Sequence, residues 1–92
     1  MKTIYVFEEY RDSAGTCTEK IFNNKEQAVK YARKKWDRLS LDDKVSYTSD
    51  ILNGCGWFMV YRADIPDDCR PHCLNLSEYM VGIPIGIRSI ID

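Results

Sequence analysis

The residues best suited to chemistry in this chain are the thiols and the imidazole of one short segment, Cys69-Arg70-Pro71-His72-Cys73. Thiolate sulfur and imidazole nitrogen are the ligands that structural zinc prefers. A further ligand would have to come from Cys17 or Cys55. The segment offers one C-x2-H-C spacing and the chain contains no C-x2-C pair, so the spacing favours unligated thiols. A structural zinc site at Cys69, His72 and Cys73 and a disulfide formed under oxidising conditions both stay open.

The same segment raises the question of nucleophilic catalysis, with His72 as the base for Cys69 or Cys73. Such a pair needs a third group to orient the imidazole and a site for the oxyanion. His72 is the only histidine of the chain, and no G-x-S-x-G elbow or glycine-rich phosphate loop is present. We expect no catalytic residue, no cofactor and no enzymatic activity. The following aspartates are assigned to solvated surface: Asp42, Asp43, Asp50, Asp64, Asp67 and Asp68.

One face of a predicted helix is basic and is the candidate surface for nucleic acid. Its residues are Lys30, Arg33, Lys34 and Arg38. Glu26 and Asp37 are interspersed among them, and the chain has 14 acidic and 13 basic residues. A phosphate-binding surface usually carries a larger excess of positive charge, so this composition disfavours nucleic acid as the main partner.

Length and composition bound the class of protein. With 92 residues, 45% hydrophobic and 29% charged, the chain is expected to form one domain over residues 1–92. Glu8 and Glu9 interrupt the apolar run near the N-terminus, which predicts no signal peptide. No stretch approaches the ~18 apolar residues of a membrane span. We therefore expect a cytoplasmic protein without a membrane partner, in which cysteines remain reduced.

The element that organises the chain is an amphipathic helix from Asn24 to Leu39. Asn24 is a good N-cap, and Gln27 stands where the partner residue of a capping box belongs. At 100° per residue, the apolar side chains fall on one arc, so the helix is expected to lie on a sheet with Trp36 as its anchor. Lys35 is expected at the rim of this arc, with its ammonium group in water.

The remaining elements follow from β-branched and aromatic runs separated by turn residues. They are a strand at Lys2–Arg11, a turn at Asp12–Gly15, an edge strand at Cys17–Asn23, a short helix at Leu41–Ser49, a strand at Trp57–Tyr61, a loop at Asp64–His72, and a tail from Leu74 to Asp92. Within the tail, residues 81–87 suggest an irregular edge strand or a packed extended segment.

This order predicts an α+β fold, a small antiparallel or mixed sheet of three to four strands with one main helix packed on one face (β-β-α-(α)-β-tail). A crossover through the helix places the third strand beside the first, which makes the first strand central.

The helix and its sequel also carry a family resemblance. The run Ala28…Ala32…Trp36…Leu39-Ser40…Asp43-Lys44, after a YVFEEYRD strand, resembles small uncharacterised proteins of Firmicutes and their mobile elements. The resemblance covers the first half of the chain, because the stretch CGWFMVYRADIPDDCRPHC has no counterpart in it. It implies a similar hairpin–helix core and a small accessory protein, and it carries over no catalytic residue.

The sheet face opposite the helix is the best functional clue. Either the tail covers this face, or another protein or a second copy of the chain does. Aromatic and methionine side chains typical of interfaces would supply the contact: Tyr5, Phe7, Trp57, Met59 and Tyr61. The predicted function is a non-enzymatic protein-binding module. Size and resemblance suggest an inhibitor or modulator of a host or phage-defence enzyme. The alternative is a nucleic-acid-binding accessory protein that uses the basic helix face.

Overall fold

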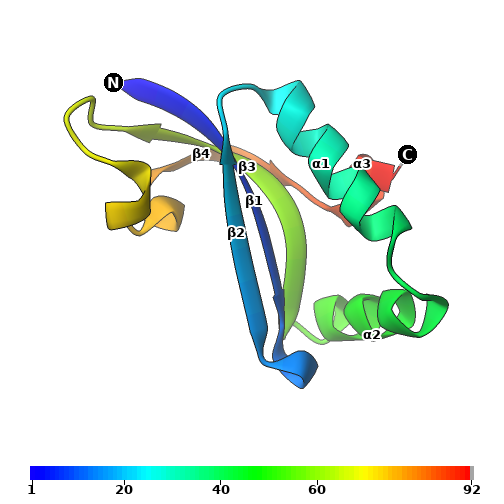
Figure 1. Ribbon diagram of the computed structural model, residues 1–92. Helices are drawn as coiled ribbons and strands as arrows, with labels where there is room; N and C mark the ends of the chain where they lie inside the picture. Colours follow the sequence, from blue (N-terminus) through cyan, green and yellow to red (C-terminus); the bar gives the residue numbers. More distant parts are fainter. Residues whose placement is uncertain (92) are drawn as a thin grey trace.

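The computed structural model describes residues 1–91 and has an α+β architecture, as predicted (Figure 1). The strands are β1 (Lys2–Arg11), β2 (Thr16–Phe22), β3 (Gly56–Ile65) and β4 (Met80–Ile85). The helices are α1 (Lys25–Asp37), α2 (Leu41–Leu52) and α3 (Ile87–Ile91), with 3-10 turns η1 (Asp12–Ala14), η2 (Pro71–Cys73) and η3 (Leu76–Tyr79).

The sheet is antiparallel throughout and has the strand order β2-β1-β3-β4. The β1–β2 hairpin closes at Gly15, whose φ of 64° lies in the left-handed region that glycine adopts without steric cost. β2 and β3 lie on opposite sides of β1, so the chain crosses over through α1 and α2 to reach the far side of β1. The predicted central position of the first strand is confirmed.

Both main helices begin at the predicted caps. The Asn24 side chain accepts a hydrogen bond from the Gln27 N–H at 2.9 Å, and the Ser40 hydroxyl accepts one from the Asp43 N–H at 3.1 Å. α2 ends at Leu52, beyond the predicted end at Ser49. Tyr47 and, partly, Ile51 pack against the core, and this tertiary contact extends the helix beyond its weak sequence pattern.

α1 packs on one face of the sheet, on the side seen to the right of the strands in Figure 1. Phe7 and Phe58 from the sheet meet edge to face with ring centroids 4.9 Å apart, and Trp36 meets Phe58 in the same way at 5.4 Å. Ala28 and Ala32 are fully buried between them, which lets the helix approach the sheet closely.

The opposite sheet face is covered over part of its length by the segment containing η2 and η3. Leu76 is 1% exposed and packs in a cluster with Ile4, Val6 and Tyr61. The tail therefore covers this face at the end of the sheet near Ile65, as in one of the alternatives that the sequence left open.

The rest of the tail does not stay on that face. β4 pairs with β3 as an irregular edge strand whose register shifts between Val60 and Arg62, which confirms one of the two predicted forms for residues 81–87. α3 then returns to the α1 side, where Ile90 is fully buried. β3 is also longer than predicted, because it continues to Ile65 beside β1. Within residues 1–91, no helix is long and apolar enough to cross a membrane.

Candidate protein-binding surface

The alternation of strand side chains divides the five predicted contact residues between two faces of the sheet. Tyr5 and Phe7 lie on the face that α1 covers. Trp57, Met59 and Tyr61 lie on the opposite face, as shown by their register with β1. The prediction of a single apolar surface built from all five residues is therefore wrong.

Two of the five are also too deeply buried to reach a partner. Phe7 has no exposed surface and meets Tyr31 of α1 with ring centroids 5.4 Å apart. Tyr61 is 2% exposed and belongs to the cluster under Leu76. Phe7 and Tyr61 are thus core residues, and Tyr5 is partly buried against α1.

What remains accessible is the end of the second face near the β1–β2 turn. We call this surface the open half-face and define it by residues that share the face in the strand register: Glu8, Tyr10, Cys17, Glu19, Trp57 and Met59. They are half-buried or exposed, and the η2–η3 cluster lies over the other end.

An aromatic pair forms one side of the open half-face. Tyr10 and Trp57 are direct cross-strand partners, with ring centroids 4.7 Å apart and planes tilted by 36°. The Tyr10 hydroxyl donates a hydrogen bond to Asp12 at 2.7 Å. Trp57 is 37% exposed, so a large amphipathic ring is held at the surface by a rigid strand.

An acidic pair forms the other side. Glu8 of β1 and Glu19 of β2 face each other directly across the hairpin. Burial raises the pKa of Glu8, the charge of Glu19 raises it further, and a hydrogen bond with Trp57 acts in the opposite direction. Like charges directly opposite on a sheet destabilise it, so the pair is a local cost to the fold.

The sequence analysis missed this acidic pair, although a signal was present. Counting outward from the Asp12–Gly15 turn pairs Glu8 with Glu19 once the hairpin register is known. The predicted turn at Asp12–Gly15 is compatible with this register, but the predicted second strand began at Cys17 and left Thr16 unassigned, so the pairing of Arg11 with Thr16 was not predicted.

Tyr61 carries a buried hydroxyl on the same sheet face as the acidic pair. Within the described part of the chain, the Tyr61 hydroxyl oxygen is buried and has no hydrogen-bond partner. Burial raises the pKa of Tyr61, and the charges of Glu8 and Glu19 raise it further. Buried polar atoms without partners are rare, and each calls for a physical explanation.

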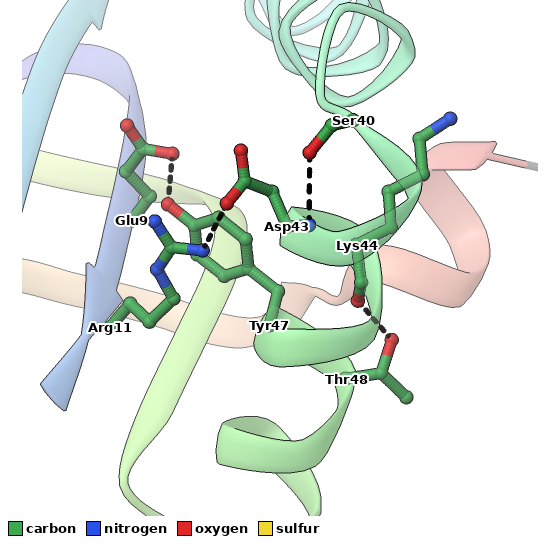
Figure 2. Close-up of polar contacts among 7 residues, drawn as sticks. All are labelled: Glu9, Arg11, Ser40, Asp43, Lys44, Tyr47 and Thr48. Carbon is green, nitrogen blue, oxygen red and sulfur yellow. Dashed lines mark hydrogen bonds and ion pairs between the residues drawn. The ribbon is translucent and has the colours of Figure 1, made fainter. Parts of the chain in front are cut away.

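The α1 face carries a separate polar cluster (Figure 2). Glu9 is 6% exposed and accepts a hydrogen bond from the Tyr47 hydroxyl at 2.8 Å, as Figure 2 shows. Glu9 also pairs with the Lys35 ammonium at 2.6 Å. Arg11 lies over the Tyr47 ring at 4.5 Å from its centroid and pairs with Asp43 at 3.2 Å. These contacts fasten α1 and α2 to β1, so we assign the cluster to structure. Lys35 is consequently not the solvated rim residue that we predicted.

The predicted nucleic-acid residues are exposed along α1, but one of them has a structural contact. The Arg33 Nε atom donates a hydrogen bond to the Ile90 carbonyl at 2.9 Å, which ties α3 to α1. Lys30, Lys34 and Arg38 are exposed. A shallow groove of about 440 Å³ runs past Tyr31, Lys34, Lys35, Arg38 and Leu39.

The cysteines lie at opposite ends of β3. Cys17 and Cys55 are near the hairpin end, whereas Cys69 and Cys73 follow the far end of the strand. A ten-residue strand spans roughly 33 Å, so the two pairs cannot share one metal ion. Among residues 1–91, no group of three or more His, Cys, Asp or Glu side chains is arranged to hold a metal ion. The four cysteines are free thiols in this structure.

Comparison of the chain with family models, curated proteins and solved structures found no match.

Proposed function

We propose that this chain is a non-enzymatic module that binds another protein through the open half-face. The observation that carries the proposal is the Trp57–Tyr10 pair, in which Trp57 is exposed, held on a rigid sheet beside the half-buried Glu8 and the exposed Glu19. Tryptophan and tyrosine are the side chains that most often dominate binding free energy at protein interfaces. An inhibitor or modulator of an enzyme acts in this way, by occupying a surface of its target.

The test has two steps, because the partner must first be isolated. A photo-crosslinking amino acid at Cys17, which is exposed beside Tyr10, would trap the partner in extracts of the native host. The purified partner would then be titrated with wild-type protein and with Trp57→Ser by calorimetry. We expect Trp57→Ser to weaken binding at least about tenfold, equivalent to ~1.4 kcal/mol.

The matched control is Leu52→Ser, which removes a large exposed apolar side chain (81% exposed) from α2, outside the open half-face. Equal binding by wild-type protein and Trp57→Ser would contradict the proposal. Equal losses for Trp57→Ser and Leu52→Ser would also contradict it, because the contact would then not be specific to the open half-face.

The alternative function is nucleic-acid binding through the exposed cations of α1. Lys30, Lys34 and Arg38 favour it, together with the groove beside them. The triple variant Lys30→Glu, Lys34→Glu and Arg38→Glu leaves the Arg33–Ile90 hydrogen bond in place. Only this alternative predicts that the triple variant abolishes a steeply salt-dependent interaction with single- or double-stranded nucleic acid.

A further inference from the structure

We propose that a hollow beside the N-terminal end of α1 binds a small organic acid, whose carboxylate is held by Lys25 and Arg62. The hollow has a volume of about 260 Å³ and is lined by residues of β1, α1, β3 and β4. This volume is just below the ~300–1,000 Å³ typical of ligand pockets, which suits a small ligand. The hollow shares no residue with the open half-face, so this inference goes beyond the proposed function and does not depend on it.

The irregular pairing of β4 opens the hollow. Val60 and Arg62 are two residues apart on β3, whereas their partners on β4, Ile85 and Val81, are four residues apart. The two extra residues make β4 bulge, and Gly82 within the bulge has a φ of 75°. The hollow lies at this bulge, since all four of the pairing residues line it.

Aliphatic side chains form most of the wall. Val60, Val81, Ile83 and Ile85 all line the hollow. Ile83 is 94% exposed and Val81 is 43% exposed, so apolar surface faces water beside the bulge. A ligand with an apolar body would remove part of this surface from water, which is favourable, whereas an inorganic anion would not.

The charge of the lining identifies the polar group of the ligand. Lys25 and Arg62 line the hollow, and no acidic side chain of the described residues does. The Arg62 Nε and Nη2 atoms donate to Asp64 at 3.1 Å each, which leaves Nη1 without a hydrogen bond to residues 1–91. Two cations and one paired carboxylate leave one net positive charge, and this charge is complementary to a single carboxylate.

The position of Lys25 in α1 also favours an anion. Lys25 is the first residue of this 13-residue helix, so the positive end of the helix dipole lies beside the hollow. The Lys25 ammonium group forms no ion pair with the described residues, so it is available to a ligand.

The experiment uses the full chain and 4-methylpentanoate, which combines one carboxylate with a branched aliphatic body. The acid would be titrated into ¹⁵N-labelled protein while the amide resonances of Lys25, Gly82 and Ile83 are followed by NMR. We expect saturable shifts with a dissociation constant in the millimolar range, as for other ligands of this size. The uncharged 4-methylpentanamide and inorganic phosphate should each bind several-fold more weakly.

Two variants test the two parts of the site. Lys25→Gln removes a cation, Ile83→Ser removes exposed aliphatic surface, and each should weaken binding of 4-methylpentanoate at least about threefold. The matched controls are Lys30→Gln and Leu52→Ser, which make the same changes at exposed positions outside the hollow and should leave the titration unchanged. The amide spectrum of each variant would verify that it remains folded.

Four outcomes would overturn the site. They are the absence of saturable shifts at Lys25, Gly82 and Ile83, equal binding of the amide, equal binding of phosphate, and equal losses in the test and control variants. The dipeptide N-acetyl-glycyl-leucine distinguishes a peptide C-terminus from a free acid. If it binds tenfold more tightly than 4-methylpentanoate, the ligand is a peptide C-terminus and the small-acid proposal is wrong.

Discussion

At the scale of single residues, the molecule contains two glutamates with opposite surroundings. Glu9 is buried on the α1 face, where Lys35 and Tyr47 provide both charge and hydrogen bonding. Glu8, its neighbour in sequence, lies on the other face opposite a second acid. One carboxylate therefore supports the fold, and the other strains it at the surface that we propose for binding.

This contrast predicts a dependence of stability on pH. The charged or titratable groups that face Glu8 are Glu19 and Cys17 of β2 and Tyr61 of β3. Because the folded-state pKa of Glu8 is raised, the folded chain binds more protons than the unfolded chain between the two pKa values. The unfolding free energy therefore falls as pH rises through this window.

Glu8→Gln should remove this fall of the unfolding free energy with rising pH. We expect it to raise stability at neutral pH by about 0.2–1 kcal/mol, the range for cross-strand pairs, and to change little at low pH. Chemical unfolding from about pH 4 to pH 8 would measure this. A variant less stable than wild type at neutral pH would show that the acidic pair is not repulsive.

Removing a charge from the Glu9 cluster should instead destabilise the protein. Lys35→Met leaves a buried carboxylate without its cation. We expect the free energy of unfolding to fall by about 2 kcal/mol. This is less than the ~3–5 kcal/mol expected for a fully buried pair, because the Lys35 side chain is 30% exposed. Lys34→Met, on the exposed side of α1, is the matched control and should change stability by less than about 0.5 kcal/mol. Equal effects of the two substitutions in denaturant unfolding would rule out a specific role for the Lys35–Glu9 pair.

At the scale of elements, the junction between α2 and β3 depends on close approach of backbone to backbone. A Cβ atom at Gly56 would lie 2.9 Å from the Asp50 Cβ and 3.0 Å from the Tyr10 carbonyl oxygen. Neither atom is the end of a flexible side chain. The start of β3 therefore requires glycine for space.

Gly56→Ala should consequently destabilise the protein by about 1–3 kcal/mol, the usual cost of overpacking. Gly86→Ala is the control, because a Cβ there meets no atom within 4 Å and φ is not positive. Thermal unfolding of both variants would test this, and a neutral Gly56→Ala would mean that α2 shifts freely relative to β3.

At the scale of the whole molecule, the sheet has two cores of different origin. The α1 face is filled by α1 together with Tyr47 of α2 and Ile90 of α3, whereas the opposite face is filled by Leu76 and its neighbours. This division leaves half of the second face accessible and makes the C-terminal segment part of the fold.

Leu76→Ala should therefore behave as a core substitution. We expect the free energy of unfolding to fall by about 2–4 kcal/mol, as for other buried leucines. Leu52→Ala, at an 81% exposed leucine, should change stability by less than about 0.5 kcal/mol. Denaturant unfolding would measure both, and an unaffected Leu76→Ala would show that the η2–η3 segment does not stabilise the sheet.

The sequence by itself determined the local elements of this protein. The Asn24 and Ser40 caps, the apolar arc of α1 and the hairpin turn at Gly15 are short-range features, in which the deciding atoms lie within a few residues of one another. The central position of β1 followed from its two apolar faces and the crossover rule.

Only the tertiary structure decided how the faces are divided. Alternation along β1 and β3 allowed either set of side chains to face α1, and the register placed Phe7 under the helix and Trp57 on the other side. Pairing of Glu8 with Glu19, and of Glu9 with Lys35, likewise depends on strand register and helix docking. These contacts join residues distant in sequence, and a shift of one residue in register would exchange the two faces.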